Sequence, residues 1–451
     1  MVHSFKVLDD YFLLDSESGS VFHIDRAAHE AVQIMTGNAP SKKEISDDIK
    51  EAINELESLK DQGVLFCQPP EPEEVKYNGD IKSMCLNISH RCNLKCKYCF
   101  AKEGTYGGQA ADMSLEIAKK AIDFLIMHSG KRHFLEIDFF GGEPILNFDV
   151  VKSAVEYAKV QAPKFNKTFR FTITTNGVIF NEDQIDFINQ NMSNVVISID
   201  GRPEVHNNAR PFAGGQESYD KVLKFAKNFR SIRGSKDYYI RGTYTAQNLD
   251  FANDVLWIND QGFDQISIEP VVLPYEHVMA IKQEHIQKIK DEYERLAKEY
   301  LERRKTEKWF NFFHFMINFE GGPCEKKRVS ACSAGNEYVA IAPDGLIYPC
   351  HQFVGNHDFV LGDLKNWNKD SKLPLNEEIR NKFQNCNIHT KPKCKNCFAK
   401  YYCSGGCAAN NYNLNNDIND PVDVMCEVIR KRTECAIAVN ILENYSKQSV
   451  D

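Results

Sequence analysis

The spacing of three cysteines constrains this chain more than any other feature of its sequence. Cys92, Cys96 and Cys99 lie within eight residues in the pattern C-x3-C-x2-C, directly after a predicted strand over 84–88. Three thiolates on one short loop can hold three irons of a [4Fe–4S] cluster and leave the fourth iron open to another ligand. A zinc loop or structural thiols are the alternatives, but zinc usually takes four ligands in two pairs. The spacing therefore favours an iron–sulfur site.

The cysteine count and the charge disfavour several classes of protein. The chain has 15 cysteines among 451 residues, and an odd number without a secretion signal argues against a disulfide framework. The net charge of −8 disfavours a general nucleic-acid binder. No run of about 18 apolar residues is present, so we expect no membrane span. With no signal-peptide core near its start, we expect a cytoplasmic protein.

The first part of the chain predicts a small winged-helix-like unit followed by a linker. Its predicted elements are a β-hairpin over 5–23, helices near 27–35 and 46–59, and a short strand over 64–66. An acidic, proline-rich stretch over 68–74 has the composition of a linker, so it marks a domain boundary.

The middle of the chain alternates between strands and helices. From about residue 84 to 271 this alternation predicts an α/β fold with a parallel sheet or barrel, whose sites lie at the carboxyl ends of the strands. A charged helical pattern covers 277–306. Beyond about residue 310 the sequence becomes irregular and rich in Cys, Gly and Lys, until a last helix near 424–443. The predicted domains are 1–75, 80–308 and 309–451.

The cysteine loop and three strand-end motifs resemble those of the radical S-adenosylmethionine (SAM) superfamily. The cysteine motif, with Tyr98 before its third cysteine, is a full match, and Phe140-Gly-Gly-Glu-Pro144, Thr174–Gly177 and Ser198–Gly201 follow later strands. The resemblance implies a partial (β/α)6 TIM-like barrel. It also implies that the open iron chelates SAM, whose one-electron reduction gives a 5′-deoxyadenosyl radical.

The same resemblance assigns SAM contacts residue by residue. Glycines let a backbone approach the ligand, and Glu143 would be the charge partner of the SAM ammonium group. Tyr98 would meet the adenine, chiefly through its backbone. Ser198 and Arg210 would contact the ribose or the carboxylate, with strand-end turn chemistry as the alternative. The implied SAM-binding residues are Tyr98, Gly141, Gly142, Glu143, Thr174, Asn176, Ser198 and Arg210.

Later cysteines resemble the SPASM domain, a seven-cysteine extension that carries two auxiliary [4Fe–4S] clusters. Their pattern is Cys332-x12-Gly-x4-Cys350, Cys394-x2-Cys397-x5-Cys403-x3-Cys407 and Cys426. A zinc ribbon is the alternative for the four cysteines from 394 to 407. The resemblance implies an outer cluster on Cys394, Cys397, Cys403 and Cys426, and an inner cluster on Cys332, Cys350 and Cys407. Cys324 could complete the inner cluster; otherwise its last iron is open to a substrate thiolate. We therefore expect three [4Fe–4S] clusters.

Nearly the whole chain resembles the maturases of six-cysteine SCIFF peptides, which form thioether crosslinks. The N-terminal unit and residues 91–108 and 323–355 carry this resemblance. It implies a ribosomally made, cysteine-rich precursor peptide with a leader as partner, and an electron donor such as flavodoxin or ferredoxin. The radical would remove a hydrogen from an acceptor carbon, with the α-carbon as the expected position, and a peptide cysteine sulfur would bond there.

Two other functions are alternatives. Sulfatase maturases, which oxidise Ser or Cys, place an aspartate after the cysteine equivalent to Cys350, where this chain has His351. His351 is a candidate catalytic proton acceptor, or a hydrogen-bond donor that positions another group. A non-enzymatic iron–sulfur electron carrier is the second alternative, but it leaves the SAM motifs without a role.

The N-terminal unit is expected to bind the leader peptide rather than DNA. A DNA-reading helix would be basic, yet the helix over 46–59 carries five acidic residues against Lys50 alone. An extended leader could join the edge of the hairpin through main-chain hydrogen bonds.

Overall fold

The computed structural model describes residues 1–38, 45–69, 71, 77–317 and 325–448. The chain folds into two compact units, each assembled from segments that are distant in sequence. The first unit comprises Met1–Val75, Lys282–Ala331 and Cys386–Asp451, and the second comprises Lys76–Ile281 and Cys332–Asn385. The predicted three-domain division stays a prediction.

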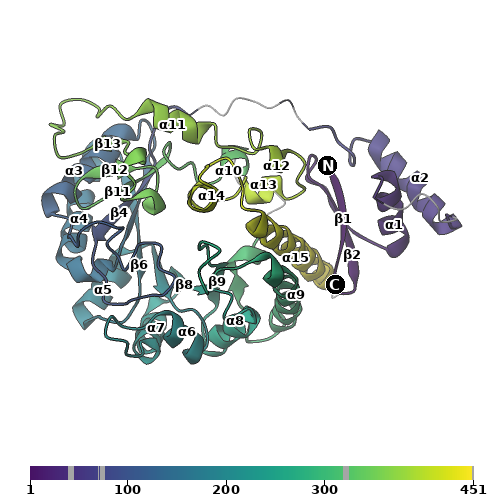
Figure 1. The fold of residues 1–451 in the computed structure, drawn as a ribbon, viewed down its shortest axis with the longest axis horizontal. Helices are drawn as coiled ribbons and strands as arrows, with labels where there is room; N and C mark the ends of the chain where they lie inside the picture. Colours follow the sequence, from purple (N-terminus) through teal and green to yellow (C-terminus); the bar gives the residue numbers. More distant parts are fainter. Residues whose placement is uncertain (39–44, 70, 72–76, 318–324, 449–451) are drawn as a thin grey trace. The chain divides into compact units, whose positions relative to one another are not determined.

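A parallel sheet forms the centre of the second unit (Figure 1). Its six successive strands are β4 (Ser83–Ser89), β5 (Phe134–Gly141), β6 (Thr168–Thr175), β7 (Asn194–Ser198), β8 (Asp237–Tyr244) and β9 (Gln265–Pro270). The helices between them are α3 (Leu115–His128), α4 (Phe148–Gln161), α5 (Glu182–Asn191), α6 (Pro203–Ala209), α7 (Tyr219–Arg233) and α8 (Phe251–Asp260). This order confirms the predicted α/β fold with a parallel sheet.

The edge of this sheet next to β4 is extended by later parts of the chain. β11 (Tyr338–Ile341) pairs parallel to β4, β12 (Leu346–Tyr348) pairs antiparallel to β11, and β13 (Gly362–Asp363) pairs antiparallel to β12. The helix α11 (Glu377–Gln384) belongs to the same unit. β11, which lies between Cys332 and Cys350 in the sequence, is therefore the neighbour of the strand from which the first cysteine loop departs.

The two faces of the sheet differ in burial. On β5, Leu135, Ile137 and Phe139 are completely buried, whereas the alternating residues Asp138 and Phe140 are only partly buried. Successive side chains of a strand point to opposite faces. The helices α3 and α4 pack beside β4 and β6, so the apolar set lies under helices and the other set lines the inner face. The sheet thus keeps an inner face with polar side chains.

The first unit contains a three-stranded antiparallel sheet rather than the expected single hairpin. β1 (Val2–Val7), β2 (Asp10–Asp15) and β3 (Val21–Ile24) pair in that order, because a tight turn with Leu8 at φ +56° separates the first two strands. The helices α1 (Arg26–Met35) and α2 (Asp47–Asp61) pack on it around Leu13, Val32 and Leu56. Residues 70 and 72–74 of the predicted linker lie outside the described residues.

Two further expectations in the first unit need correction. The predicted strand over 64–66 is a turn that ends α2, since Gly63 and Phe66 have positive φ angles and Val64 donates its N–H to the Leu59 carbonyl. The predicted helix over 277–306 is shorter: α9 spans Ile286–Arg303, after an extended Lys282. Leu65 is nevertheless buried against the N-terminal core, so its apolar character reports packing rather than strand structure.

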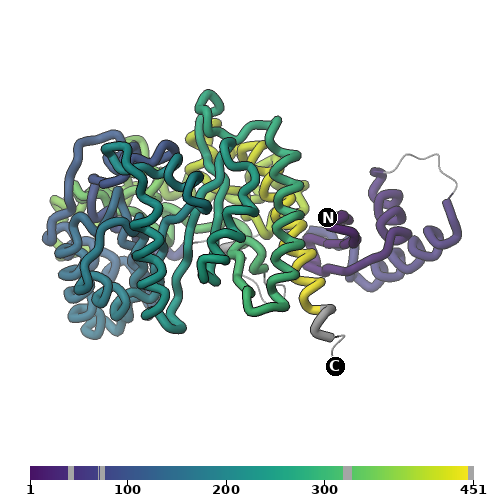
Figure 2. Tube along the Cα trace, turned by 90° about the horizontal axis from the view of Figure 1, so that it is seen from below, coloured from purple at the N-terminus to yellow at the C-terminus, as the bar shows by residue number. Residues whose placement is uncertain are grey.

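Two long helices, α9 and α15 (Asp423–Gln448), pack side by side in the first unit (Figures 1 and 2). The unit also contains the short helices α10 (Glu325–Ser330), α12 (Pro392–Lys395), α13 (Lys400–Cys403) and α14 (Ala408–Asn415). The His3 ring stacks on Phe398 with centroids 3.7 Å apart, and the Lys400 ammonium lies 2.6 Å from the Glu17 carboxylate. The N-terminal sheet therefore packs directly on the segment that carries the C-terminal cysteines. No helix among the described residues is long and apolar enough to cross a membrane.

Candidate functional site

The first cysteine loop leaves the carboxyl end of β4 and is held by backbone hydrogen bonds on one side. The Lys95 N–H donates to the Pro211 carbonyl (2.8 Å), and the Lys97 N–H donates to the Ala209 carbonyl (2.9 Å). The segment after α6 therefore pairs with the loop much as a strand would. This pairing brings Arg210, a predicted SAM-binding residue, next to the cysteines.

Gly141, the last residue of β5, and the following Gly142 and Glu143 hold the other side of the loop. The Gly142 N–H donates to the Ser89 carbonyl (2.7 Å), and the Glu143 N–H donates to the Arg91 carbonyl (2.8 Å). A Cβ at Gly141 or Gly142 would collide with these same two carbonyl oxygens, and Gly141 has φ +125°. Glycine is therefore required here for close approach to the cysteine loop. The predicted approach of these glycines to SAM stays a prediction.

Glu143 is almost completely buried and accepts hydrogen bonds from the end of β6. Its carboxylate accepts from the Thr175 hydroxyl (2.8 Å), the Asn176 N–H (2.7 Å) and the Ile145 N–H (3.1 Å). Burial raises the pKa of Glu143 to about 7, although these three donors favour the charged form. The side chain thus joins the ends of β5 and β6.

The end of β6 also reaches the first cysteine. The Asn176 side-chain amide donates to the Asn93 side-chain oxygen (2.7 Å) and lies 3.7 Å from the Cys92 sulfur. Thr174, two residues before Asn176, is partly buried on the inner face of the sheet. The structure therefore places the predicted residue Asn176 directly at the cysteine loop.

Asp200 is the centre of the site and was not among the predicted site residues. Its buried carboxylate accepts from the Tyr98 hydroxyl (2.6 and 2.9 Å), the Arg210 guanidinium (3.0 Å) and the Thr243 N–H (3.1 Å). The Arg210 guanidinium lies 5.4 Å from the centroid of the Tyr98 ring and 3.9 Å from the Cys96 sulfur. The sequence signal that could have identified Asp200 is a carboxylate in the Ser198–Gly201 motif, directly after a buried strand. Ser198 itself ends β7, opposite Arg241 on β8.

His206 holds the backbone of Asp200 through a hydrogen bond. The Asp200 N–H donates to His206 Nδ1 (3.3 Å), and Nε2 lies 3.1 Å from the Ser218 hydroxyl, which donates to the Arg210 carbonyl (2.5 Å). Burial lowers the pKa of His206 to about 4, so the ring is neutral at pH 7. A neutral ring with one acceptor and one donor nitrogen satisfies both contacts.

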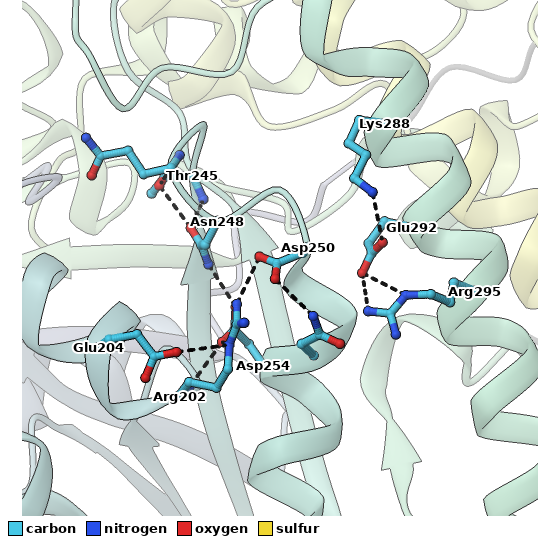
Figure 3. A network of polar contacts seen from close by, with 11 residues as sticks. Arg202, Glu204, Thr245, Asn248, Asp250, Asp254, Lys288, Glu292 and Arg295 are labelled. Carbon is cyan, nitrogen blue, oxygen red and sulfur yellow. Dashed lines mark hydrogen bonds and ion pairs between the residues drawn. The ribbon is translucent and has the colours of Figure 1, made fainter.

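A polar network fixes the turn after Asp200 (Figure 3). The Arg202 guanidinium lies 2.8 Å from the buried Asp254 carboxylate and 2.9 Å from Asp250, and Asn248 donates to Asp254 (3.1 Å). A Cβ at Gly201 would collide with the Asp254 side chain. The ends of β7 and β8 are therefore locked together. The Lys288–Glu292–Arg295 group drawn in the same figure belongs to α9 of the first unit.

The first loop fits an iron–sulfur cluster. Its sulfurs already have nitrogen donors nearby: the Leu94 N–H and the Asn176 amide at Cys92, and the Arg210 guanidinium at Cys96. Such donors stabilise the negative charge of cluster sulfurs and thiolates. Burial raises the pKa of Cys92 to about 12 and that of Cys96 to about 11, so the free thiols are neutral until a metal displaces their protons. Among the described residues, no three His, Cys, Asp or Glu side chains are gathered closely enough to hold a single metal ion.

His351 lies in a small aromatic cluster on the second unit. Its ring centroid is 5.6 Å from that of Phe100 and 5.1 Å from that of Phe140, and its Nδ1 is 3.3 Å from the Tyr338 hydroxyl. Burial, with a contribution from Arg241, lowers the pKa of His351 to about 4. Because Phe100 follows Cys99 in sequence and His351 follows Cys350, this cluster joins two predicted cluster-binding segments. Sequence reasoning missed both phenylalanines, since nothing in their spacing distinguishes them from core residues.

The predicted outer ligands are gathered in the first unit. Burial raises the pKa of Cys426 to about 12, with further contributions from the Cys394, Cys397 and Cys403 thiols, so these four sulfurs lie near one another. Cys403 also accepts backbone N–H donors from Gly405 and Gly406. The set fits an iron–sulfur cluster for the same reason as the first loop.

The predicted inner ligands come from both units. Cys332 is exposed and Cys350 is buried in the second unit, while Cys407 precedes α14 in the first unit. Cys324 lies outside the described residues. This ligand set stays a prediction.

Known protein families match the regions of the chain that carry this site. Residues 86–243 match the radical SAM superfamily and residues 332–398 match the SPASM iron–sulfur cluster-binding domain. A cysteine-type anaerobic sulfatase-maturating enzyme from Clostridium novyi is 25% identical over 370 residues, which cover 77% of this chain and 93% of that enzyme. An uncharacterized protein of Methanocaldococcus jannaschii, MJ0907, is 34% identical over 144 residues, which cover 32% of this chain and 47% of that protein. That match spans about half the length of MJ0907.

Solved structures share the fold. The structure of anSMEcpe with bound AdoMet has a TM-score of 0.67 at 19% identity and covers 80% of this chain and 99% of its own. Streptococcus suis SuiB bound to S-adenosylmethionine has a TM-score of 0.56 at 15% identity and covers 92% of this chain and 96% of its own. The two domain matches enclose the first cysteine loop, its strand-end partners and the C-terminal cysteines from 332 to 397. The part of the chain that carries this site is therefore similar to radical SAM proteins that have a SPASM iron–sulfur domain.

Proposed function

We propose that this enzyme forms a thioether crosslink between a cysteine sulfur and a carbon of another residue in a ribosomally made precursor peptide. The observation that carries the proposal is the assembly of Cys92, Asn176, Glu143, Asp200 and Arg210 at the ends of neighbouring parallel strands. Among structures of the same fold, anSMEcpe was solved with a Kp18Cys peptide and SuiB with the precursor peptide SuiA. These two peptide complexes favour a peptide substrate for this chain too.

Each residue of the site has a proposed task. The cluster and SAM would supply the radical that removes a hydrogen atom, and Cys92, Cys96 and Cys99 would hold that cluster. Arg210, kept in place by buried Asp200, offers a cationic group close to the Cys96 sulfur, where the SAM carboxylate is expected. We keep the proposed SAM contacts of Tyr98 in the cysteine loop and of the strand-end residues Gly141, Gly142, Glu143, Thr174, Asn176 and Ser198. We further propose three [4Fe–4S] clusters, two of them in the SPASM domain.

His351 is better suited to positioning than to general-base chemistry. A general base works best when its pKa lies near the working pH, whereas the pKa of His351 is about 4. Its ring instead packs between Phe140 and Phe100, with Nδ1 at the Tyr338 hydroxyl. We therefore assign it to the wall of the substrate site.

The N-terminal sheet is the proposed docking site of the leader. β3 is an edge strand of this sheet, with main-chain groups that can pair with an extended peptide. The acidic helix α2 packs in the same core, which disfavours phosphates and leaves apolar contacts for leader side chains.

The experiment is peptide modification under anaerobic conditions. The reconstituted enzyme is incubated with SAM, dithionite and a cysteine-rich precursor peptide encoded beside its gene. We expect the peptide to lose two hydrogen atoms per crosslink and one alkylatable thiol, with the new bond located by fragmentation. An unmodified peptide in reactions that form 5′-deoxyadenosine would overturn the peptide assignment.

A second candidate function is the oxidation of a Ser or Cys side chain to formylglycine. The similarity to the Clostridium novyi sulfatase-maturating enzyme over 77% of this chain favours it. His351 in place of the aspartate argues against it. The same assay with a cysteine-containing sulfatase peptide decides the matter, because an aldehyde that reacts with hydrazine appears only if this function is correct.

A further inference from the structure

The inner face of the parallel sheet carries an acidic side chain, Asp138, for which the site described above gives no role. Asp138 lies on β5, and the strand register pairs it with Cys85 on β4 and Thr172 on β6. Side chains two residues apart on a strand point to the same face, so Asp138 shares its face with Phe140, whose ring centroid is 5.1 Å from that of His351. Asp138 therefore lies about 7 Å along β5 from the wall assigned to the substrate site.

The Asp138 carboxylate has a hydroxyl donor but no cationic partner. It accepts a hydrogen bond from the Thr172 hydroxyl, and no Lys, Arg or His side chain in the described part of the chain forms an ion pair with it. Arg170, two residues before Thr172 on β6, instead lies over the Phe134 ring, 5.2 Å from its centroid. The Asp138 side chain is only partly buried, so a substrate group and water can reach it.

The surroundings of Asp138 suit a group that takes up a proton. The titratable and charged neighbours on the strands around it are Glu136 on β5, Cys85 on β4, Arg170 on β6 and Tyr338 on β11. Burial, with a smaller contribution from Glu136, raises the pKa of Asp138 to about 6, although the Thr172 hydroxyl favours the charged form. Asp138 is therefore mostly charged at pH 7, yet it binds a proton more readily than an ordinary aspartate.

Other polar groups near the site are already engaged or are poor bases. Glu143 accepts three hydrogen bonds, and Asp200 is paired with Arg210. The pKa of His351 is about 4, so it holds a proton too weakly. A cysteine thiol has an ordinary pKa of about 8.5 and is protonated at pH 7, so it needs a base whose pKa lies near the working pH.

We propose that Asp138 is the catalytic base that accepts the proton of the peptide cysteine thiol as the carbon–sulfur bond forms. The inference rests on the proposed function and names a residue for its proton transfer. The acceptor carbon loses a hydrogen atom to the 5′-deoxyadenosyl radical. The sulfur loses its proton to Asp138 and bonds to that carbon, and one electron passes to an iron–sulfur cluster of the SPASM domain. Asp138 then releases the proton to water.

The test removes the carboxylate and compares a matched control. Asp138→Asn keeps the size of the side chain and an oxygen for Thr172, but it cannot take up the proton. Glu136→Gln makes the same change of charge on the same face of β5, two residues farther from Phe140. Asp138→Glu restores the carboxylate. Each full-length protein is reconstituted anaerobically and given SAM, dithionite and the precursor peptide encoded beside its gene, and crosslinks and 5′-deoxyadenosine are counted in the same reaction across a range of pH.

The measured quantity is the number of crosslinks per 5′-deoxyadenosine. In the wild type this ratio should rise with pH through about 6 and then level off, because Asp138 must be charged to accept a proton. In Asp138→Asn the ratio should fall at least about 100-fold and lose this rise, and Asp138→Glu should recover part of both. The Glu136→Gln control should behave like the wild type. An unchanged ratio in Asp138→Asn, or an equal loss in the control, would overturn the role of Asp138.

The titration of Asp138 is also measured without turnover. Infrared difference spectra between the reconstituted wild type and Asp138→Asn isolate the carboxylic acid band of this side chain. They should give Asp138 a pKa of about 6, and a pKa at the ordinary value of 3.8 would overturn the assignment. A wild type that forms 5′-deoxyadenosine but no crosslink at any pH would instead overturn the proposed function.

Discussion

The first cysteine loop and the outer C-terminal cysteines differ in which hydrogen-bond donors reach their sulfurs. In the first loop, side chains from distant strand ends reach the sulfurs: Asn176 reaches Cys92, and Arg210 reaches Cys96. In the C-terminal set, the donors to Cys403 are nearby backbone N–H groups of Gly405 and Gly406. The Lys391 ammonium holds that glycine turn by donating to the Gly405 carbonyl (2.7 Å).

The difference indicates different tasks. Side chains from several strands can bind a small molecule beside the cluster as well as support it, which suits a site of chemistry. Cys403 receives backbone donors from its own turn and Cys394 packs against Val329 and Ile388, so a cluster held by these thiols would be suited to holding and passing electrons. Changing the ligands of each site, and the residues that hold them, tests this difference.

Removing the first loop's thiols should abolish the reaction. The variant Cys92→Ala/Cys96→Ala/Cys99→Ala should bind one cluster fewer, about 8 irons instead of about 12 per chain. It should form no 5′-deoxyadenosine. Iron analysis and product chromatography after anaerobic reconstitution provide the measurement. Full iron content in this variant would mean that the loop is not a cluster site.

Changes in the SPASM domain should separate SAM cleavage from crosslinking. Cys350→Ala or Cys407→Ala removes a predicted inner ligand and leaves the first loop intact. We expect 5′-deoxyadenosine to form at a reduced rate while crosslinked peptide disappears. Quantifying both products in one reaction tests this, and normal crosslinking by either variant would show that the inner cluster is dispensable.

Arg210 should prove to have a role beyond its ion pair. Arg210→Gln leaves buried Asp200 without its cation, which is expected to cost about 3 kcal/mol of unfolding free energy. Adding Asp200→Asn should recover much of that stability but not SAM cleavage, which we expect to stay about tenfold below wild type or lower. Denaturant unfolding and cleavage rates provide the two readouts. Full recovery of cleavage by the double variant would reduce Arg210 to a structural residue.

His206 should make the second unit sensitive to acid. Its pKa is about 4 in the folded protein, below the ordinary value of 6.5, so the unfolded chain binds the extra proton first as pH falls. The stability contributed by the neutral ring is complete above about pH 6.5 and is lost towards pH 4, by up to about 3 kcal/mol. His206→Gln should flatten this dependence in denaturant titrations at several pH values. An unchanged slope would exclude His206 as its source.

The alternation of strands and helices and the compact cysteine motif could be predicted because both are written in short, regular sequence patterns. The importance of Asp200 and His206 could not, since it depends on strand ends and a helix that meet only after folding. The turn at Leu8 escaped prediction because a bulky residue rarely adopts a positive φ. The strand predicted over Val64–Phe66 was wrong for a different reason. A short run of apolar residues that packs onto a core has the same sequence pattern as a short strand.

Formation of 5′-deoxyadenosine tests most directly whether this chain has radical SAM activity. The enzyme is reconstituted anaerobically with iron and sulfide, and is then given SAM and dithionite, with the product measured by chromatography. We expect 5′-deoxyadenosine from the wild-type protein and none from the triple cysteine variant. A wild-type protein that carries about 12 irons yet yields no 5′-deoxyadenosine, or one that is colourless and binds zinc instead, would contradict it.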